Sequence, residues 1–253
     1  MQARRFPASQ GWVWLKQGFA LWRRAPIVLT GACLTMFMLL LVSAILPVLG
    51  QVLPALLLPP LGVGMFLLCG EIRRQGTPSP GFLFQGFRLN LPRQFAIGAM
   101  RLVGQLLCML AAAKLSGLDP STPLGKLSSD GTVLQIVPQF RSFVTWFAAL
   151  GLPLELCFWF SPQLVALGGV SPFKSVFFSV IACWRNLPAI VVCLVAWAVL
   201  FGLLPAFVMN LIGAALPALS ALLIAPLMLV MMPVFYASFH ASATDIFGET
   251  LRT

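Results

Sequence analysis

Long apolar runs without a single charge constrain the fold of this chain more than any other feature. Two examples are "LTMFMLLLVSAIL" at 34–46 and "LLIAPLMLVMMPVF" at 222–235. Only 9% of the 253 residues are charged, whereas soluble domains carry roughly 25%. Backbone polar groups inside a bilayer must be satisfied by helices or by closed barrels. The runs do not alternate between apolar and polar residues as barrel strands do, so they predict an all-α polytopic membrane protein forming a single domain over 1–253.

The positions of the apolar runs and of the basic residues predict the topology. Runs of spanning length predict six transmembrane helices, over 26–48, 52–71, 92–116, 140–168, 188–210 and 214–240. The fourth is expected to be the least regular, and 117–139 to be the one sizeable polar loop. In this topology thirteen of the sixteen Lys and Arg residues lie on the side of the N-terminus, and only Lys114, Lys126 and Arg141 lie opposite. The positive-inside rule then predicts an inner-membrane protein with both termini in the cytoplasm.

The N-terminal segment is expected to remain attached. Arg4 and Arg5, a following apolar run and "VSA" at 42–44 imitate a secretory signal peptide. However, the charged part is long and contains an amphipathic helix of its own, and the apolar run is long enough to span.

Short matches between distant segments predict a threefold internal repeat. "WRRAP" at 22–26 corresponds to "WRNLP" at 184–188, and "LPAL" occurs at both 53–56 and 216–219. A weaker middle copy reads "SPGFLFQGFRLNLP" at 79–92, beside "SPFKSVFFSVIACWRNLP" at 171–188. The predicted units cover about 8–75, 78–168 and 170–247. Each is an amphipathic interfacial helix, a proline, a span out and a span back, so the repeats are parallel.

The segment "GWVWLKQGFALWRRAP" at 11–26 explains how such a unit begins. On a helical wheel its tryptophans, Phe19 and leucines fill one half, while Lys16, Gln17 and two arginines fall on the other. Such a helix lies in the membrane interface, with rings at the acyl boundary and cations near anionic headgroups. Pro26 suits the first turn of the following helix, because its missing N–H would be unpaired there. The same corner is expected at Pro92 and Pro188.

These interfacial segments are open to two interpretations. They are ordinary membrane anchors, or they form a cytoplasmic rim that binds anionic lipid or another anionic ligand. The residues of the predicted rim are Trp22, Arg23, Arg24, Arg88, Arg93, Trp184 and Arg185.

The N-terminal segment resembles a family of uncharacterised proteobacterial integral membrane proteins. The resemblance rests on Gly11, Trp12, Trp14, Gly18, Phe19 and Pro26 and covers most of the chain in layout. More distantly, the repeat unit is similar in architecture to the membrane domain of some bacterial glycerophosphodiester phosphodiesterases, whose catalytic domain has no counterpart here. Both resemblances imply a lipid-facing role, and neither implies a catalytic residue.

Glu155 is the most unusual residue of the predicted spans. It lies in the apolar stretch "FAALGLPLELCFWF" behind Pro153, which removes a backbone hydrogen bond. Ionisable residues at such depth usually face a bundle interior or a wet cavity. Glu155 is therefore either a proton- or cation-binding group of a transport path, or a protonated structural residue. His240, at the cytoplasmic end of the last span, is a structural residue or a proton relay.

No catalytic or metal-binding constellation accompanies these residues. The chain has one histidine and lacks the short motifs of nucleotide, dinucleotide and zinc sites and of serine hydrolases. We therefore expect a non-enzymatic protein without metal or cofactor. It would bind or organise anionic phospholipid, or anchor a membrane assembly, as a homo-oligomer or with another membrane protein. The alternative is a small transporter or channel that uses Glu155. The net charge of +10 follows the positive-inside pattern, so nucleic acid is not an expected partner.

Overall fold

The computed structural model describes residues 3–46, 49–50, 52–117, 133–207, 210 and 217–251. All regular elements within these ranges are helical, as the apolar runs predict. They are α1 (Gln10–Arg24), α2 (Pro26–Ile45), α3 (Val52–Arg73), η1 (Pro80–Arg88), α4 (Leu91–Ser116), α5 (Val133–Phe158), α6 (Ser161–Ala166), α7 (Pro172–Arg185), α8 (Leu187–Ala198), η3 (Val199–Leu203), α10 (Pro217–Phe247) and η4 (Gly248–Leu251).

Five of the described helical segments are long and apolar enough to cross a bilayer. They run over Pro26–Ile45, Val52–Arg73, Leu91–Ser116, Pro138–Ala166 and Leu187–Phe207. The fourth is interrupted between α5 and α6, at Trp159 and Phe160. That it is the least regular stays a prediction, because the fifth also passes from α8 into the π-helix η3. The first residues of the predicted sixth span, 214–216, lie outside the described residues, and α10 covers the remainder. Most of the predicted loop 117–139 also lies outside them, although α5 already begins at Val133.

The three proline corners lie where the sequence places them. Pro26 is the first residue of α2, and Pro92 and Pro188 are the second residues of α4 and α8. Each follows a separate helix whose last residue is Arg24, Arg88 or Arg185. The middle one, η1, is a 3₁₀ helix rather than an α-helix.

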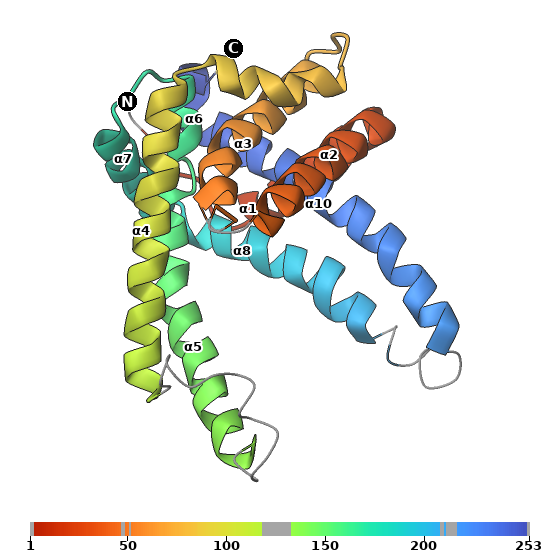
Figure 1. Cartoon of the computed structure of the whole chain (residues 1–253). Helices are drawn as coiled ribbons and strands as arrows, with labels where there is room; N and C mark the ends of the chain where they lie inside the picture. The colour runs from red at the N-terminus through yellow and green to blue at the C-terminus, as the bar shows by residue number, and fades with distance from the viewer. Residues whose placement is uncertain are drawn as a thin grey trace.

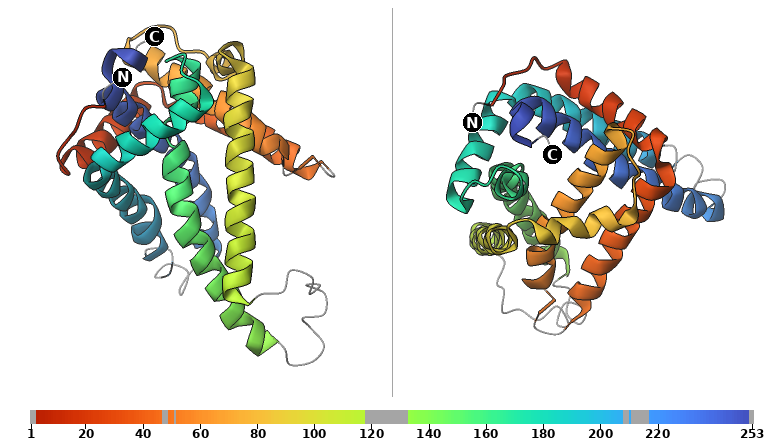
Figure 2. Two further views of the ribbon diagram at one scale, coloured as in Figure 1. Left: turned by 90° about the vertical axis from the view of Figure 1, so that its left-hand side faces the viewer. Right: turned by 90° about the horizontal axis from the view of Figure 1, so that it is seen from above.

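The helices form three pairs, α2–α3, α4–α5 and α8–α10 (Figure 1), which diverge from the end of the molecule at which both termini lie (Figure 2, left). The further views show that α4 and α5 run side by side (Figure 2). Each helix before a proline corner packs against the returning helix of a different pair: α1 against α10, η1 against α3, and α7 against α5. This cyclic exchange follows the order of the three predicted units, whose relation as repeats stays a prediction.

The docking of α1 corrects one expectation about its apolar half. Trp14 is fully buried inside the protein, whereas Trp12 and Phe19 remain about 40% exposed. The reason is that Gly11 and Gly18 lie on one face of α1. Because glycine has no side chain, α1 approaches its neighbouring helices closely there. Gly11 lies against the backbone of Ala189 in α8, and Gly18 against that of Ser238 in α10. Half of the predicted interfacial surface is therefore a helix–helix contact.

Candidate functional site

A large polar cavity, here called the basin, lies between α1, α3 and α10 at the end of the molecule that carries both termini. Its volume is about 780 Å³. The polar side chains among the described residues that line it are Arg4, Gln10, Gln17, Arg73, Arg74, His240, Thr244 and Asp245. Three guanidinium groups thus face one carboxylate, which gives this lining a net charge of about +2.

The one carboxylate of that lining is already engaged by α1. Oδ2 of Asp245 accepts hydrogen bonds from Nε2 of Gln10, at 3.0 Å, and from Nε1 of Trp14, at 2.9 Å. The N-terminal segment is fixed beside it, since the Arg4 amide donates to the Ile246 carbonyl at 2.9 Å. These bonds hold the Asp245 carboxylate against α1, and the three arginines remain the majority charge of the basin.

Arg73 connects the basin to a smaller cavity of about 210 Å³ beside α1. This second cavity is also lined by Gln17 and His240, and it adds Arg24. Nη1 of Arg73 donates to the Thr244 hydroxyl at 2.9 Å, so α3 holds the guanidinium against α10. The buried His240 ring lies 4.6 Å from the ring of Phe66, centroid to centroid. The pair of cavities presents four arginines in all: Arg4, Arg24, Arg73 and Arg74.

The predicted rim residues do not gather in these cavities, with the exception of Arg24. Arg23, Arg88 and Arg185 are exposed at the ends of their helices. Arg93 is also exposed, and its Nη1 donates to the Gly169 carbonyl at 2.9 Å.

The two rim tryptophans differ from each other. Trp184 is 77% exposed, whereas Nε1 of Trp22 donates to the Thr30 hydroxyl at 3.1 Å. Trp22 therefore secures the corner between α1 and α2.

Glu155 is paired with a cation inside the bundle. Its Oε2 lies 2.6 Å from Nη2 of Arg101, and its Oε1 accepts from Nε of Arg101 at 3.2 Å. Nε2 of Gln105 donates to the same Oε1 at 3.0 Å. The two-pronged geometry is the strongest form of an arginine–carboxylate interaction, so the carboxylate is held by α4 rather than left open for a free cation. Pro153, in the same helix, is exposed.

The position of this pair corrects the prediction that Arg101 lies on the side of the membrane that carries the termini. The charge count places Arg101 with the cations on the side of the termini, but it is the eleventh residue of the 26-residue α4. At 1.5 Å per residue, it lies about 15 Å along that helix from its start.

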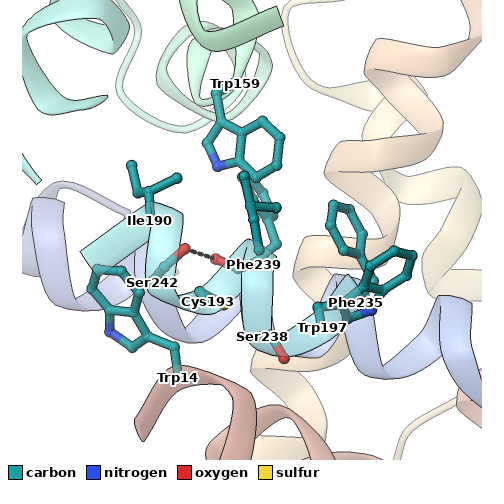
Figure 3. Close-up of a pocket in the computed structure, with 10 residues that line it drawn as sticks. Trp14, Trp159, Ile190, Cys193, Trp197, Phe235, Ser238, Phe239 and Ser242 are labelled. Carbon is teal, nitrogen blue, oxygen red and sulfur yellow. Dashed lines mark hydrogen bonds between the residues drawn. The ribbon is translucent and has the colours of Figure 1, made fainter. Parts of the chain in front are cut away.

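The Arg101–Glu155 pair lines a second site, here called the inner cavity, of about 260 Å³. Gln163 of α6 and five aromatic residues complete most of its wall: Phe158, Trp159, Phe235, Tyr236 and Phe239. Three of them, Trp159, Phe235 and Phe239, also line an apolar cavity of about 20 Å³ next to Trp14 and Trp197 (Figure 3). The Phe239 ring lies 6.4 Å from the Phe66 ring, which in turn contacts His240 of the basin.

The comparisons place the chain among known proteins. It is 31% identical over 268 aligned residues to a probable inner membrane protein of Burkholderia thailandensis, and the alignment covers 98% of this chain and 94% of that relative. No protein-family model matches the chain, and no solved structure matches it.

Proposed function

The chain belongs to the same family as the Burkholderia thailandensis probable inner membrane protein, and from this premise we propose that it is a non-enzymatic protein that binds anionic lipid headgroups. Its apolar helices and that relative make it a multi-pass inner membrane protein. The finer step, from membrane protein to lipid binding, rests on the basin. Three arginines beside α1 offer charge-assisted hydrogen bonds to phosphate oxygens.

The surroundings of the basin favour a lipid phosphate as its ligand. α1 lines the two cavities through Gln10, Gln17 and Arg24. On another face it bears exposed Trp12 and Phe19, and Nζ of Lys16 lies 5.5 Å from the Trp12 ring centroid. Exposed aromatic and basic side chains on one helix are typical of a segment at the headgroup level. A phosphate in the basin would therefore lie at the depth of the lipid headgroups, since α1 itself lines the basin.

A test of this proposal compares lipid retention in two arginine variants. In Arg73→Gln/Arg74→Gln, native mass spectrometry should show the preference for phosphatidylglycerol over phosphatidylcholine falling roughly thirtyfold. The estimate takes about 1 kcal/mol for each arginine near anionic lipid. The rim variant Arg23→Gln/Arg185→Gln should lose less, because neither residue lines the basin. Lys174→Gln, on the exposed surface of α7, controls for the loss of a charge alone.

The possible outcomes distinguish lipid binding in the basin from lipid binding at the rim and from binding of a small anion. An unchanged lipid preference in the Arg73/Arg74 variant would overturn the basin as the site, and a loss confined to the rim variant would return the proposal to the rim. Added inorganic phosphate serves as a third arm. If it displaces phosphatidylglycerol at equimolar concentration, the ligand is a small anion and not a lipid.

The second candidate function is transport of a small solute through the bundle. The observation that favours it is the inner cavity, which brings ionisable groups of two spans, Arg101 and Glu155, to one cavity with a mainly apolar lining. Because Glu155 is bound to Arg101, it would take part in transport as half of an ion pair and not as a free carboxylate. His240 does not line the inner cavity. Partners other than lipid, including a second copy of the chain, remain part of the proposal and rest on no contact described above.

A further inference from the structure

The inner cavity lies where the fourth span is broken. α5 ends at Phe158 and α6 begins at Ser161, so the wall of the cavity contains an interruption of the helix at Trp159 and Phe160. Pro59 of α3 and Pro162 of α6 also line it. Interrupted helices within membrane proteins occur where the backbone borders a cavity or is packed in protein.

The charged groups of the inner cavity neutralise each other, but one of its polar groups lacks a hydrogen-bond partner among the described residues. Arg101 and Glu155 neutralise each other at 2.6 Å. Gln163 is only 4% exposed, and its buried Oε1 accepts no hydrogen bond from the part of the chain that the structure describes. An unsatisfied buried acceptor costs about 1–3 kcal/mol, and a ligand that carries a donor removes that cost.

The side chains of the ion pair are partly exposed. Those of Arg101 and Glu155 are 25% and 35% exposed, although Arg101 lies about 15 Å along α4 from its start. Neighbouring residues on α4, such as Val103 and Leu107, are more than half exposed. An exposed apolar surface at this depth faces lipid, so α4 borders the bilayer on the side away from Arg101, while the ion pair lines the inner cavity.

We propose that the inner cavity binds a neutral, lipid-soluble hydroxylated aromatic molecule, of the chemical class of the hydroquinones, whose O–H donates to Oε1 of Gln163. A ligand with net charge is disfavoured, because the ion pair offers no surplus charge to compensate its desolvation. Three rings surround the space, with Trp159 5.9 Å from both Phe235 and Phe239, and they pack against a flat aromatic body. A cavity of about 150 Å³ already binds benzene elsewhere, so about 260 Å³ accommodates a substituted ring.

This site is separate from the proposed headgroup site, because none of the described residues lines both the inner cavity and the basin. The lipid-retention test can therefore fail while the hydroquinone test succeeds, and the reverse also holds.

The experiment uses the full chain in mixed micelles and compares a short-chain hydroquinone with its oxidised quinone. The two differ in the O–H groups, so the hydroquinone should raise the melting temperature and the quinone, which has no donor for Gln163, should bind at least about tenfold more weakly. Gln163→Leu should abolish the hydroquinone shift. It should also leave the empty protein as stable as the original or more stable, since it removes an unsatisfied acceptor.

Gln94→Leu is the matched control. Gln94 is also fully buried with an unpartnered Oε1, but its Nε2 donates to the carbonyls of Gly86 and Leu89, and it does not line the inner cavity. This variant should be destabilised yet retain the hydroquinone shift.

Four results would overturn the proposal. Hydroquinone does not raise the melting temperature, or the quinone raises it equally. The lipid dioleoylglycerol raises it and hydroquinone does not, or the rise with hydroquinone survives in Gln163→Leu.

Discussion

Replacement of Gly64 by alanine should destabilise the protein by about 2–3 kcal/mol, whereas the same change at Gly62, two residues earlier in α3, should not. A Cβ on Gly64 would overlap the backbone of Leu83 in η1, and one on Gly62 would meet no atom within 4 Å. The backbone of Leu83 cannot move aside as a flexible side chain can, and overpacking typically costs 1–3 kcal/mol. In an open helical position, alanine instead gains roughly 0.5–1 kcal/mol over glycine.

The pairing of η1 with α3 makes this effect large. Gly86 of η1 approaches α3 just as closely, and a Cβ there would overlap the Pro60 carbonyl. Between these glycines Leu83 is fully buried. The whole contact therefore depends on two backbones that touch, so Gly64→Ala would separate η1 from the bundle rather than distort it locally.

The measurement is unfolding by SDS titration in mixed micelles, followed by tryptophan fluorescence. Both variants are compared with the original chain without added ligand, and Gly31→Ala, which also has open space around its Cα, gives a second control in α2. Equal midpoints for Gly64→Ala and Gly62→Ala would show that η1 does not pack on α3 as described.

The sequence predicts the helical class and the corners of the fold well, because these depend on local chemistry. Apolar run length identifies spans, and a proline that lacks an N–H identifies a first helical turn, as at Pro26. The packing of α1 was not predictable in the same way. A helical wheel shows which residues are apolar but not whether lipid or protein covers them, and only the contacts of Gly11 and Gly18 assign Trp14 to the protein interior.

The candidate sites were predictable in part. Glu155 is visible in the sequence as an acid in an apolar run, and so is Arg101 inside the span predicted at 92–116. The predicted spans that carry them are antiparallel neighbours, and both residues lie at similar depths in the membrane. Their depth could therefore have predicted that they form a pair. The basin has no such signal. Arg4, Arg73 and Asp245 come from three segments far apart in the chain, and they lie together only because α3 and α10 both end beside α1.

The second large effect is expected at the Arg101–Glu155 pair. Glu155→Leu and Arg101→Met should each lower the free energy of unfolding by about 3 kcal/mol, since removal of one partner leaves an uncompensated charge away from water. The loss should be greater for Glu155→Leu. A carboxylate left alone can take up a proton and become neutral, whereas an arginine stays charged.

The double variant Arg101→Met/Glu155→Leu should recover most of the stability, because it removes both charges together. Arg141→Met, at an exposed position near the start of α5, is the control for loss of an arginine and should change little. SDS titration measures all four variants. Additive losses in the double variant would show that the two side chains do not interact as the 2.6 Å contact indicates.

The double variant also tests the transport candidate, which Glu155→Gln alone cannot do. Glutamine at 155 would leave Arg101 without its counter-charge, so a loss of transport in that variant could reflect misfolding. A double variant that folds but carries neither charge removes this ambiguity. If it still moved solute across proteoliposomes at the original rate, the pair would be a structural link between α4 and α5. If it folded normally and transport stopped, the two charges would belong to the solute path, and the inner cavity would be the place where that path crosses the bundle.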